Sequence, residues 1–451
     1  MPAHESITRR HRLDRVLQPF RRRRGLTVAP NLPSADRDRI AKEVEQLLAQ
    51  PETTAQRVAA ARLVAAYRGL DADGHGHFLD LLASRFGTDP AAIDRAAASL
   101  QRASTPTARA RAERDLRQAV VPRYAALLHV ITGLADGVGF LVDLRADVLA
   151  RAHDDATLGS LEDELTGHLA TLFDVGLLDL RQITWDSPAS VLDRLMETEA
   201  VHEIHGWEDL RHRLAGDQRC YGFFHPALPN EPIVFVEVAL THGLADNLPH
   251  LLEREDAVDD ADTAIFYSIT SAQPGLAGVH LGNELIKQVV DELRRTDDDL
   301  KHFATLSPLP GYRSWLRSEV KANALLPTEL EAFGPELDAI VDGDDSWVLD
   351  PALAERLRPG VLSTAARYLM TTRDGRARDS VANFHLSNGA SLERLNWLAN
   401  PAHYGIEQSL GVMVNYLYDR SKIAANAGSY LTEGSIKTSN HVKNLVKTPK
   451  R

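Results

Sequence analysis

The chain has 451 residues, of which 44% are hydrophobic and 25% are charged, and its formal net charge at pH 7 is −12. This length is typical of two or three domains with a large buried core, and the acidic balance argues against a general nucleic-acid or membrane-surface binder. The single cysteine, Cys220, excludes an intramolecular disulfide framework and a cysteine-based zinc cluster, and it favours a reducing compartment. No apolar run reaches the ~18 residues of a membrane-spanning helix.

The first 33 residues are strongly basic. Eight arginines precede Gly25, and because like charges in a block repel one another, we expect residues 1–33 to form a disordered, solvated tail. An organellar presequence is the alternative, since it is also rich in arginine, although Glu5 and Asp14 are atypical of one. We therefore expect a cytoplasmic protein, or one of the mitochondrial matrix if the tail is a presequence.

An all-helical bundle is predicted over residues 34–135. Ser34 suits the N-cap of a helix whose buried face would be Ile40, Val44, Leu47 and Leu48. Further helices are predicted over residues 58–67, 78–86, 92–100 and 108–130. The segment contains no cluster of chemically reactive side chains, and its arginine- and alanine-rich helices bury only a narrow stripe. We expect this bundle to mediate self-association into a dimer or tetramer.

Glycines 133, 137 and 139 predict a domain boundary, which we place between residues 135 and 136. A helical lead-in is expected over residues 136–181, with one helix capped near Asp155 and carrying a stripe of leucines from Leu158 to Leu172. From Gln182 onward, aromatic residues and prolines become frequent and strands replace helices. The second domain is therefore expected to span residues 136–451, with its core over 182–451.

A nearly continuous apolar run over residues 232–240 is typical of a central strand. Glu237 lies inside this run, and a carboxylate is costly to bury unless it is paired or functional. A solvent-facing edge is an equal alternative for this residue. The polar loop Thr241-His242-Gly243-Leu244-Ala245-Asp246-Asn247 follows the strand directly.

Residues 262–306 predict a βαβ unit. A β-branched run over residues 264–270 and a glycine turn over 273–278 precede apolar residues at helical spacing from Val279 to Leu293, and a second strand follows at 303–306. A helix N-terminus after a glycine turn suits a phosphate, although most such glycines only turn the chain. Because a Walker lysine and the GxGxxG spacing are both missing, the remaining ligand is the pyrophosphate of something like coenzyme A.

The rest of the chain contains a helical insertion, expected over about residues 315–370, and two segments near a possible site. Residues 383–390 crowd polar groups at an expected strand-to-turn transition, and residues 411–418 predict a strand. Ser268, His385 and Tyr418 would then converge at the C-terminal ends of central strands. Each alone is more often structural. Serine with histidine also suggests a hydrolase, but Ser268 lacks a GxSxG elbow, and no HExxH or Cys/His set indicates a metal site.

Five runs of the sequence resemble the malonyl-CoA decarboxylase family. They are ITWDSPASVLDRLMETEAVHEIHGWEDL, FYSITSAQPGLAGVHLGNELIKQVV, LSPLPGYRSWL, ANFHLSNGASLERLNWLANP and GVMVNYLYDRSKIAANAGSY. The resemblance extends from about Ala108 to Leu445 and is densest after Gln182. It implies an α+β multidomain protein, in which an N-terminal all-helical bundle mediates oligomerisation and a mixed α/β domain with a GCN5-related acetyltransferase-like fold is catalytic.

The same resemblance implies a set of site residues. It places the catalytic serine on Ser268, the catalytic histidine on His385 and the active-site tyrosine on Tyr418. Malonyl-CoA would be bound by Ser268 and His385, by the loop of residues 241–247, and by Gly278 and Gly282. The acetyltransferase pyrophosphate motif, Arg/Gln-x-x-Gly-x-Gly/Ala, falls on Ala277, His280 and Gly282, and two of these positions depart from it. Thr270 and Ser271 are close rivals to Ser268.

We accordingly expect a malonyl-CoA decarboxylase that produces acetyl-CoA and carbon dioxide. Loss of carbon dioxide leaves an enolate, and since the thioester is the electron sink, neither a metal nor an organic cofactor is expected. Pre-aimed donors would stabilise the oxyanion, and Ser268 would donate a hydrogen bond to the carboxylate and orient it. His385 would protonate the α-carbon because imidazole titrates near neutral pH. Tyr418 would donate to the thioester or to His385. The alternatives are an acyltransferase of the same fold and a non-catalytic acyl-CoA-binding protein.

Overall fold

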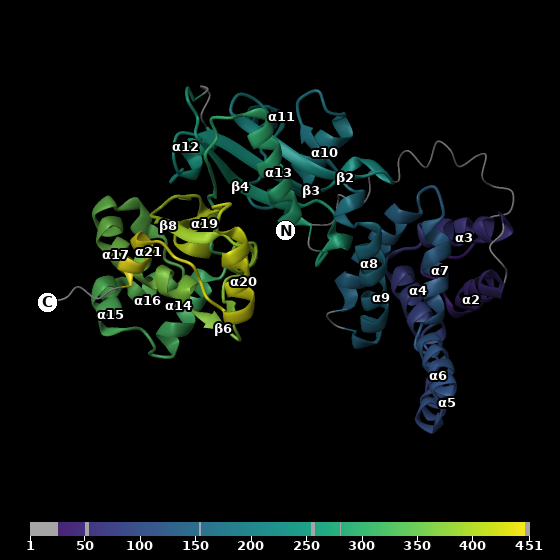
Figure 1. Cartoon of the computed structure of the whole chain (residues 1–451). Coiled ribbons are helices and arrows are strands. Elements are labelled where there is room, and N and C mark those ends of the chain that lie inside the picture. The colour runs from purple at the N-terminus through teal and green to yellow at the C-terminus, as the bar shows by residue number, and fades with distance from the viewer. Residues whose placement is uncertain (1–25, 50–53, 153–154, 254–257, 280, 447–451) are drawn as a thin grey trace. The chain divides into compact units, whose positions relative to one another are not determined.

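The computed structural model describes residues 26–49, 54–152, 155–253, 258–279 and 281–446. These residues group into two compact units, whose helices and strands are labelled in Figure 1. The first unit contains the described residues up to Leu177 together with residues 226–228 and 273–279, and the second contains the others. The disordered tail expected over residues 1–33 lies, up to residue 25, outside the described residues.

The first unit is helical, as the sequence predicts. Its α-helices are α2 (Ser34–Ala49), α3 (Thr54–Tyr67), α4 (Ala72–Arg85), α5 (Pro90–Arg102), α6 (Pro106–Ala119), α7 (Arg123–Thr132), α8 (Gly137–Ala152) and α9 (Gly159–Leu172). Its 3-10 turns are η2 (Ala156–Leu158), η3 (Val175–Leu177) and η4 (Pro274–Leu276). The buried face of α2 contains Ile40, Val44 and Leu47, which confirms the predicted stripe in large part, while Leu48 is half-buried.

One predicted helix of this unit was wrong in its length. We expected a single helix over residues 108–130, whereas α6 ends at Ala119 and α7 begins at Arg123. Pro122 lies between them with φ −68° and ψ 148°. Proline has no N–H to continue the ladder of hydrogen bonds and disfavours helical backbone in the residue before it, so the helix ends here.

The first unit also extends further along the chain than expected. We placed the boundary between residues 135 and 136, but α8 and α9 pack with the helices before them. Arg145 of α8 shows why this region holds together, since its guanidinium donates to Glu162 Oε1 at 2.8 Å, to Gly275 O at 2.7 Å and to Ala277 O at 2.8 Å. One buried arginine therefore joins α8, α9 and the glycine turn.

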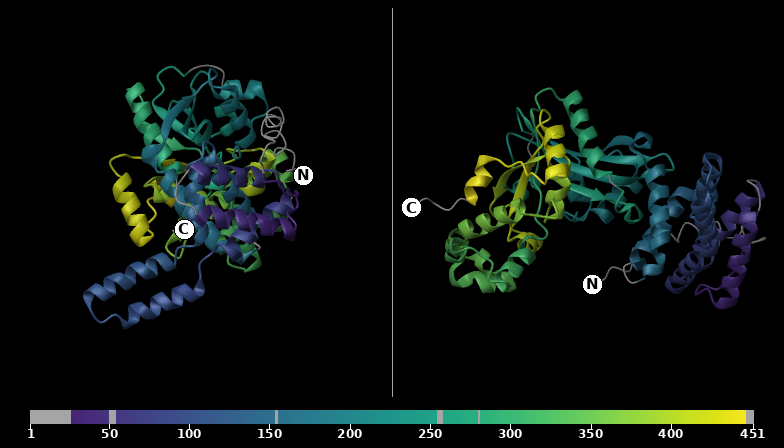
Figure 2. Two further views of the ribbon diagram at one scale, coloured as in Figure 1. Left: turned by 90° about the vertical axis from the view of Figure 1, so that its right-hand side faces the viewer. Right: turned by 60° about the horizontal axis from the view of Figure 1, so that its bottom comes forward.

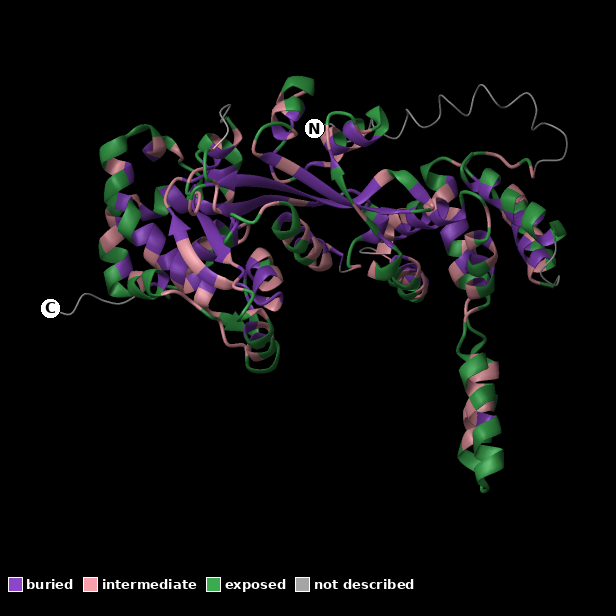
Figure 3. Ribbon diagram, turned by 45° about the horizontal axis from the view of Figure 1, so that its top comes forward, coloured by how far each residue is buried: buried purple, intermediate pink, exposed green. Residues whose placement is uncertain are grey.

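Helices α5 and α6 pack against each other as a hairpin that stands away from the other helices of the first unit (Figure 2). Most of its residues are exposed or half-buried, as the colours of Figure 3 show. Among the described residues of the two helices, only Ala112 is buried. This hairpin therefore contributes little to the core of its own unit.

A mixed seven-stranded sheet organises the second unit, in the order β1-β2-β3-β4-β5-β9-β8. Its strands are β1 (Asp179–Ile183), β2 (Gln218–His225), β3 (Leu228–Thr241), β4 (Thr263–Ser271), β5 (His302–Thr305), β8 (Ser391–Asn396) and β9 (Met413–Leu417), and β6 (Thr372–Arg373) and β7 (Arg376–Ala377) form a separate pair. Strands β4 and β5 are parallel, whereas β3 and β4 are antiparallel.

Helices cover this sheet and fill the expected insertion. They are α10 (Ala189–Thr198), α11 (Trp207–Arg213), α12 (Leu248–Leu252), α13 (Gly282–Thr296), α14 (Tyr312–Lys321), α15 (Pro327–Phe333), α16 (Leu337–Asp342), α17 (Pro351–Met370), α18 (Ser380–Ser387), α19 (His403–Ser409), α20 (Ile423–Glu433) and α21 (Asn440–Leu445), with 3-10 turns η5 (Gly334–Glu336) and η6 (Ser346–Leu349). The segment from α14 to α17 occupies almost the same residues as the predicted insertion.

Several predictions for the second unit are confirmed. The βαβ unit is β4, α13 and β5, and the strand predicted over residues 411–418 is β9. Strand β3 is central, and Glu237 within it is fully buried rather than on an edge. The strand-to-turn transition expected over residues 383–390 was wrong, because this segment begins in helix α18. Asp379 caps that helix by accepting the Ala382 N–H at 2.9 Å.

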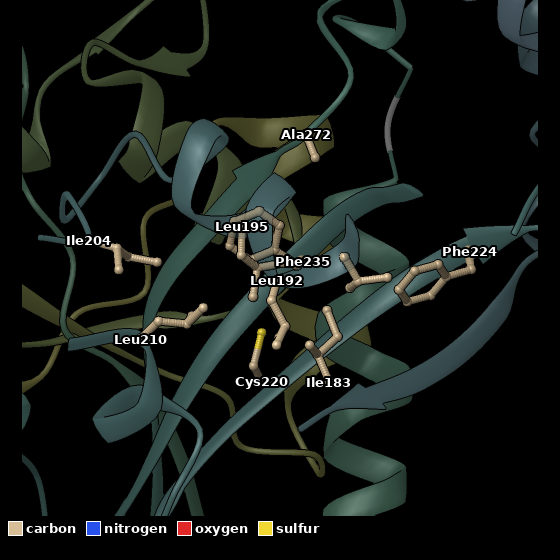
Figure 4. Packing of buried hydrophobic residues seen from close by; sticks show 10 residues of the cluster. Ile183, Leu192, Leu195, Ile204, Leu210, Cys220, Phe224, Phe235 and Ala272 are labelled. Carbon is tan, nitrogen blue, oxygen red and sulfur yellow. The ribbon is translucent and has the colours of Figure 1, made fainter. Parts of the chain in front are cut away.

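A buried apolar cluster holds α10 and α11 against the sheet (Figure 4). Its members come from β1, β2, β3, the two helices, the segment between these helices and the residue after β4: Ile183, Val191, Leu192, Leu195, Ile204, Leu210, Cys220, Phe224, Phe235 and Ala272. Cys220 is a buried member of this cluster, so it behaves as a small apolar residue. The cluster fixes the position of the chain that follows α10, which the site below uses.

Candidate functional site

Strands β4 and β5 separate after a short stretch of parallel pairing. Their register begins at Thr263 opposite His302 and ends at Phe266 opposite Thr305. Leu306 N–H still donates to Phe266 O at 3.0 Å. Beyond this point β4 pairs with β3 alone, while Ser307 pairs with Val414. We call the diverging segments, residues 267–271 and residues 306–307, the fork.

The fork presents backbone groups that the sheet does not use. In the described part of the chain, no backbone hydrogen bond joins the two arms of the fork past Leu306. The inner edges of the arms therefore have the character of edge strands, whose N–H and C=O groups are available to another molecule. An extended ligand containing amide groups would fit such a place, by the same pairing that adds a strand to a sheet.

Ser268 lies on the β4 arm and is bound to a carboxylate that the sequence did not point to. Its hydroxyl donates to Glu199 Oε1 at 2.8 Å and lies 3.3 Å from Thr270 Oγ1. Thr270 Oγ1 in turn donates to Glu199 Oε2 at 2.9 Å. All three side chains are buried, and Glu199 is the residue at which α10 ends. Ser268 therefore belongs to a hydroxyl–carboxylate cluster.

A second buried carboxylate lies opposite Ser268 in the sheet. Glu237 is the register partner of Ser268, and a β-bulge follows it. Its Oε2 lies 3.4 Å from Nη1 of Arg213, and Nε of the same arginine donates to Asp209 Oδ1 at 3.0 Å. Burial, and next to it the charge of Glu199, raises the pKa of Glu237 to about 8, and Arg213 opposes this rise. Glu237 is therefore largely protonated near pH 7, and the charge of Arg213 is paired with Asp209.

His385 is brought together with Tyr418 and with Ser307. Its Nδ1 lies 2.8 Å from Tyr418 Oη, and its Nε2 lies 3.1 Å from Ser307 Oγ. The imidazole stacks on Tyr416, with 4.6 Å between ring centroids. Burial lowers the pKa of His385 to about 3 and raises that of Tyr418 well above its ordinary value. Both groups are therefore neutral near pH 7.

The hydrogen bonds around His385 favour one tautomer. Ser307 Oγ donates its proton to Thr305 Oγ1 at 2.8 Å, which leaves its lone pairs for an incoming donor. His385 Nε2–H then donates to Ser307, and Nδ1 accepts the proton of Tyr418. Ser307 was not among the residues expected at the site, although it lies in the run LSPLPGYRSWL that carries the resemblance.

The three expected catalytic residues form two groups in the structure. His385 and Tyr418 are in direct contact and reach Ser307 on the β5 arm of the fork, whereas Ser268 lies on the β4 arm. Among the described residues, Ser268 makes no hydrogen bond to His385 or Tyr418. The two groups therefore flank the fork from its two arms, each with its own set of partners.

The loop of residues 241–247 is fixed by several hydrogen bonds. Thr241 Oγ1 donates to Gly243 O at 2.8 Å, and Gly243, with φ +71°, donates its N–H to Asp262 Oδ1 at 2.8 Å. Asn247 caps α12, and Leu244 O accepts from Arg394 at 2.9 Å.

One asparagine ties this loop to the β5 side of the fork. Asn415 Nδ2 donates to Ala245 O at 2.9 Å and to Thr305 O at 2.8 Å. Within the loop, His242 and Asp246 are exposed, while Thr241 is buried. The loop is therefore rigid at its backbone and offers side chains to a ligand.

The two glycines that we expected to bind the substrate belong to different units. Gly278 belongs to the first unit, has φ +81°, and has open space where a Cβ would lie. Gly282 belongs to the second unit and begins α13, where an added Cβ would approach the ring of Phe384 to 3.5 Å. His280, one of the three motif positions, lies outside the described residues.

Two other kinds of site are absent from the described ranges. No group of three or more His, Cys, Asp or Glu side chains in them is arranged to hold a metal ion. No helix in the same ranges is long and apolar enough to cross a membrane.

Comparisons with known proteins agree on one family. The model described as "Malonyl-CoA decarboxylase C-terminal domain" matches residues 176–451, and the corresponding N-terminal domain model matches residues 86–173. A mitochondrial malonyl-CoA decarboxylase of Anser anser anser is 36% identical over 417 residues, which cover 86% of this chain and 82% of the relative.

Solved structures give the same result. A malonyl-CoA decarboxylase crystal structure from Rhodopseudomonas palustris has a TM-score of 0.81 at 39% identity, and covers 90% of this chain and 99% of its own. A malonyl-CoA decarboxylase crystal structure from Agrobacterium vitis has a TM-score of 0.83 at 37% identity, and the match covers 91% of this chain and 100% of that chain. The predicted fold, a helical N-terminal region followed by a mixed domain of sheet and helices, is confirmed.

Proposed function

The chain belongs to the malonyl-CoA decarboxylase family and is a carboxy-lyase that converts malonyl-CoA to acetyl-CoA and carbon dioxide, and we propose that its fork is where this reaction takes place. The observation that carries this proposal is the placement of Ser268 on one arm of the fork and of Ser307, bonded to His385, on the other. The pantetheine of the substrate would lie along the inner edges, with its thioester between the two groups.

The chemistry needs electrons to move onto the thioester. Cleavage of the bond between the α-carbon and the carboxylate releases neutral carbon dioxide and leaves an enolate, whose negative charge lies on the thioester oxygen. Backbone N–H groups of the fork would stabilise this oxyanion, because they are fixed in place before the charge develops. Neither a metal nor an organic cofactor takes part in this proposal.

The α-carbon then needs a proton, and we propose that His385 and Tyr418 supply it. Our expectation that His385 acts because it titrates near neutral pH is corrected by its burial, which lowers its pKa to about 3. The donor would be the neutral pair, in which the Tyr418 hydroxyl and the imidazole N–H lie in one hydrogen-bonded chain that ends at Ser307. An enolate carbon is basic enough to take a proton from such neutral donors.

Coenzyme A would be held away from the reacting atoms. We propose that it is bound by the loop of residues 241–247, whose backbone is fixed to the fork through Asn415, and by Gly282 at the start of α13. Gly278, which belongs to the first unit, stays a prediction from the sequence. The N-terminus of α13, which begins at Gly282, offers free N–H groups to the pyrophosphate.

The test of this function is to incubate the purified protein with malonyl-CoA alone in excess EDTA. We expect acetyl-CoA and carbon dioxide in equal amounts and at an undiminished rate. A reaction that needs an amine acceptor would indicate the alternative acyltransferase, and tight binding without product would indicate a non-catalytic acyl-CoA-binding protein. A loss of activity in EDTA that a divalent ion restores would show that a metal takes part.

The pH dependence of kcat should lack the inflection near 6.5 that an ordinary histidine produces. Since His385 is neutral above a pKa of about 3, its protonation state is constant over the working range. Stability behaves differently: below about pH 6.5 the unfolded chain binds a proton that the native site excludes, so the free energy of unfolding falls as the pH falls. Rate profiles between about pH 5 and 9 test the first statement, and a clear inflection at 6.5 would contradict it.

We propose that the helical first unit mediates self-association into a dimer or tetramer, with no nucleic acid or membrane as partner. Replacing residues 90–119, the α5–α6 hairpin, by a short linker should lower the oligomer mass while activity per chain persists, because the hairpin buries little in its own unit. Sedimentation of both forms measures this, and an unchanged mass would contradict a role for the hairpin.

The cytoplasmic location stays a prediction. The similar proteins of Anser anser anser and Mus musculus are named as mitochondrial.

A further inference from the structure

Glu199 is surrounded by hydrogen-bond donors. The backbone N–H groups of Val201 and His202 each donate to its Oε1 at 2.9 Å, where the Ser268 hydroxyl also donates at 2.8 Å. Thr270 donates to its Oε2 at 2.9 Å. Only 7% of Glu199 is exposed, so the carboxylate is built into the structure as an acceptor.

This arrangement decides what Ser268 can offer to a ligand. A serine hydroxyl has one proton, and here Glu199 holds it, so Ser268 can offer lone pairs to a ligand but has no proton left for a substrate carboxylate. The expectation that Ser268 donates to the malonyl carboxylate therefore conflicts with its hydrogen bonding. A substrate carboxylate next to Ser268 would face the lone pairs of the serine oxygen, and beyond them the buried negative charge of Glu199.

We propose that Glu199 is a positioning residue that fixes Ser268 as an acceptor and sets a negative charge behind it, which weakens the binding of the malonyl carboxylate and favours its departure. The inference rests on the proposed function of Ser268 at the fork. The charge of the carboxylate moves to the thioester oxygen as the carbon–carbon bond breaks, and the carbon dioxide that leaves is neutral. A fixed charge near the carboxylate therefore destabilises the ground state more than the transition state.

The Glu199→Gln variant tests the charge. Its amide oxygen still accepts from the two backbone N–H groups, while the charge is lost and the Ser268 proton is released from its carboxylate. We expect kcat to fall by about 10- to 100-fold. We also expect sulfoacetyl-CoA, an anionic analogue that cannot lose carbon dioxide, to bind about 10-fold more tightly, and acetyl-CoA to bind as before. A merely structural role would not raise affinity for the anionic analogue alone.

Two further variants separate charge from folding. Glu199→Asp keeps the charge, so its affinity for sulfoacetyl-CoA should stay at the original value. Glu329→Gln removes a different buried carboxylate, which pairs with Arg367 at 2.9 Å in the helical insertion, and its kinetic constants should be unchanged. The inference is overturned if Glu199→Gln does not bind the anionic analogue more tightly than the original protein does. It is also overturned if Glu199→Asp binds the analogue as tightly as Glu199→Gln does.

Ser268→Ala distinguishes the failure of this inference from that of the proposed function. If Ser268→Ala is impaired and Glu199→Gln has normal kinetic constants, Glu199 has no part in the reaction and the role of Ser268 stands. If Ser268→Ala turns over normally, Ser268 has no role at the fork, and the inference falls with it.

Discussion

Replacing His385 by asparagine should lower kcat by roughly two to four orders of magnitude, the usual effect of removing a general acid. The imidazole stands between Tyr418 and Ser307, with 2.8 Å and 3.1 Å to their oxygens, so its loss interrupts the chain of neutral donors. Affinity for malonyl-CoA should change little, because the proposed contacts to coenzyme A lie in the loop of residues 241–247 and at Gly282. Steady-state rates and a direct binding measurement check both statements.

The product of this variant carries further information. Water can protonate an enolate, so His385→Asn should still release carbon dioxide slowly, and its acetyl-CoA should lose stereochemical preference when chirally labelled malonyl-CoA reacts in deuterium oxide. Ser307→Ala is the matched control: it keeps the imidazole and its contact with Tyr418, and a smaller loss of kcat is expected. Stereospecific product at nearly the original rate would remove His385 from proton delivery and leave Tyr418 as the donor.

Replacing Arg213 by methionine should lower the free energy of unfolding by about 3 kcal/mol, because the acceptors around it lose their donor and a buried acceptor left without a partner costs roughly 1–3 kcal/mol. The guanidinium contacts Glu237, which is fully buried, and donates to Asp209 and to His202 O at 2.7 Å. Removing it leaves these acceptors without compensation. Urea unfolding of the variant beside the original protein measures the loss.

The double variant Arg213→Met/Glu237→Leu is the control for this interpretation. It replaces both members of the buried pair by apolar side chains, which should restore part of the lost stability, because Glu237 is then no longer a buried polar group without its partner. Asp209 is partly exposed and is expected to tolerate the loss of its partner. A double variant as unstable as Arg213→Met alone would show that the arginine acts through packing and its carbonyl contacts instead.

Local patterns in the sequence predicted most of the elements that carry the fork. The β-branched run of β4, the apolar spacing of α13 and the apolar run of β3 are repeated signals over many residues, so they identify their elements without tertiary information. The break between α6 and α7, which contains Pro122, was missed although its signal is local. Helix α18 was missed because its polar residues resemble a turn, and the capping aspartate three residues before Ala382 was not considered.

The partners within the site were beyond the reach of sequence patterns. Glu199 is 69 positions from Ser268, and Ser307 is 78 positions from His385, so no periodicity connects either pair. Burial of His385 also decides its protonation state, and burial results from packing of α18 rather than from neighbours in the chain. The resemblance identified which residues matter, but the structure was needed to find what holds each of them.

The short pairing of β4 and β5 has a mechanical consequence. Four register pairs join the block β1–β4 to the block β5–β9–β8, so the sheet has a seam beside the fork. A coenzyme A thioester that pairs with both arms would connect the two blocks across this seam. Its binding free energy would then add to the free energy needed to separate the blocks. Amide hydrogens of residues 263–266 and 302–305 would then exchange with solvent faster in the empty enzyme than in the occupied one. The local stability of the sheet at this seam would therefore rise and fall once in each catalytic cycle.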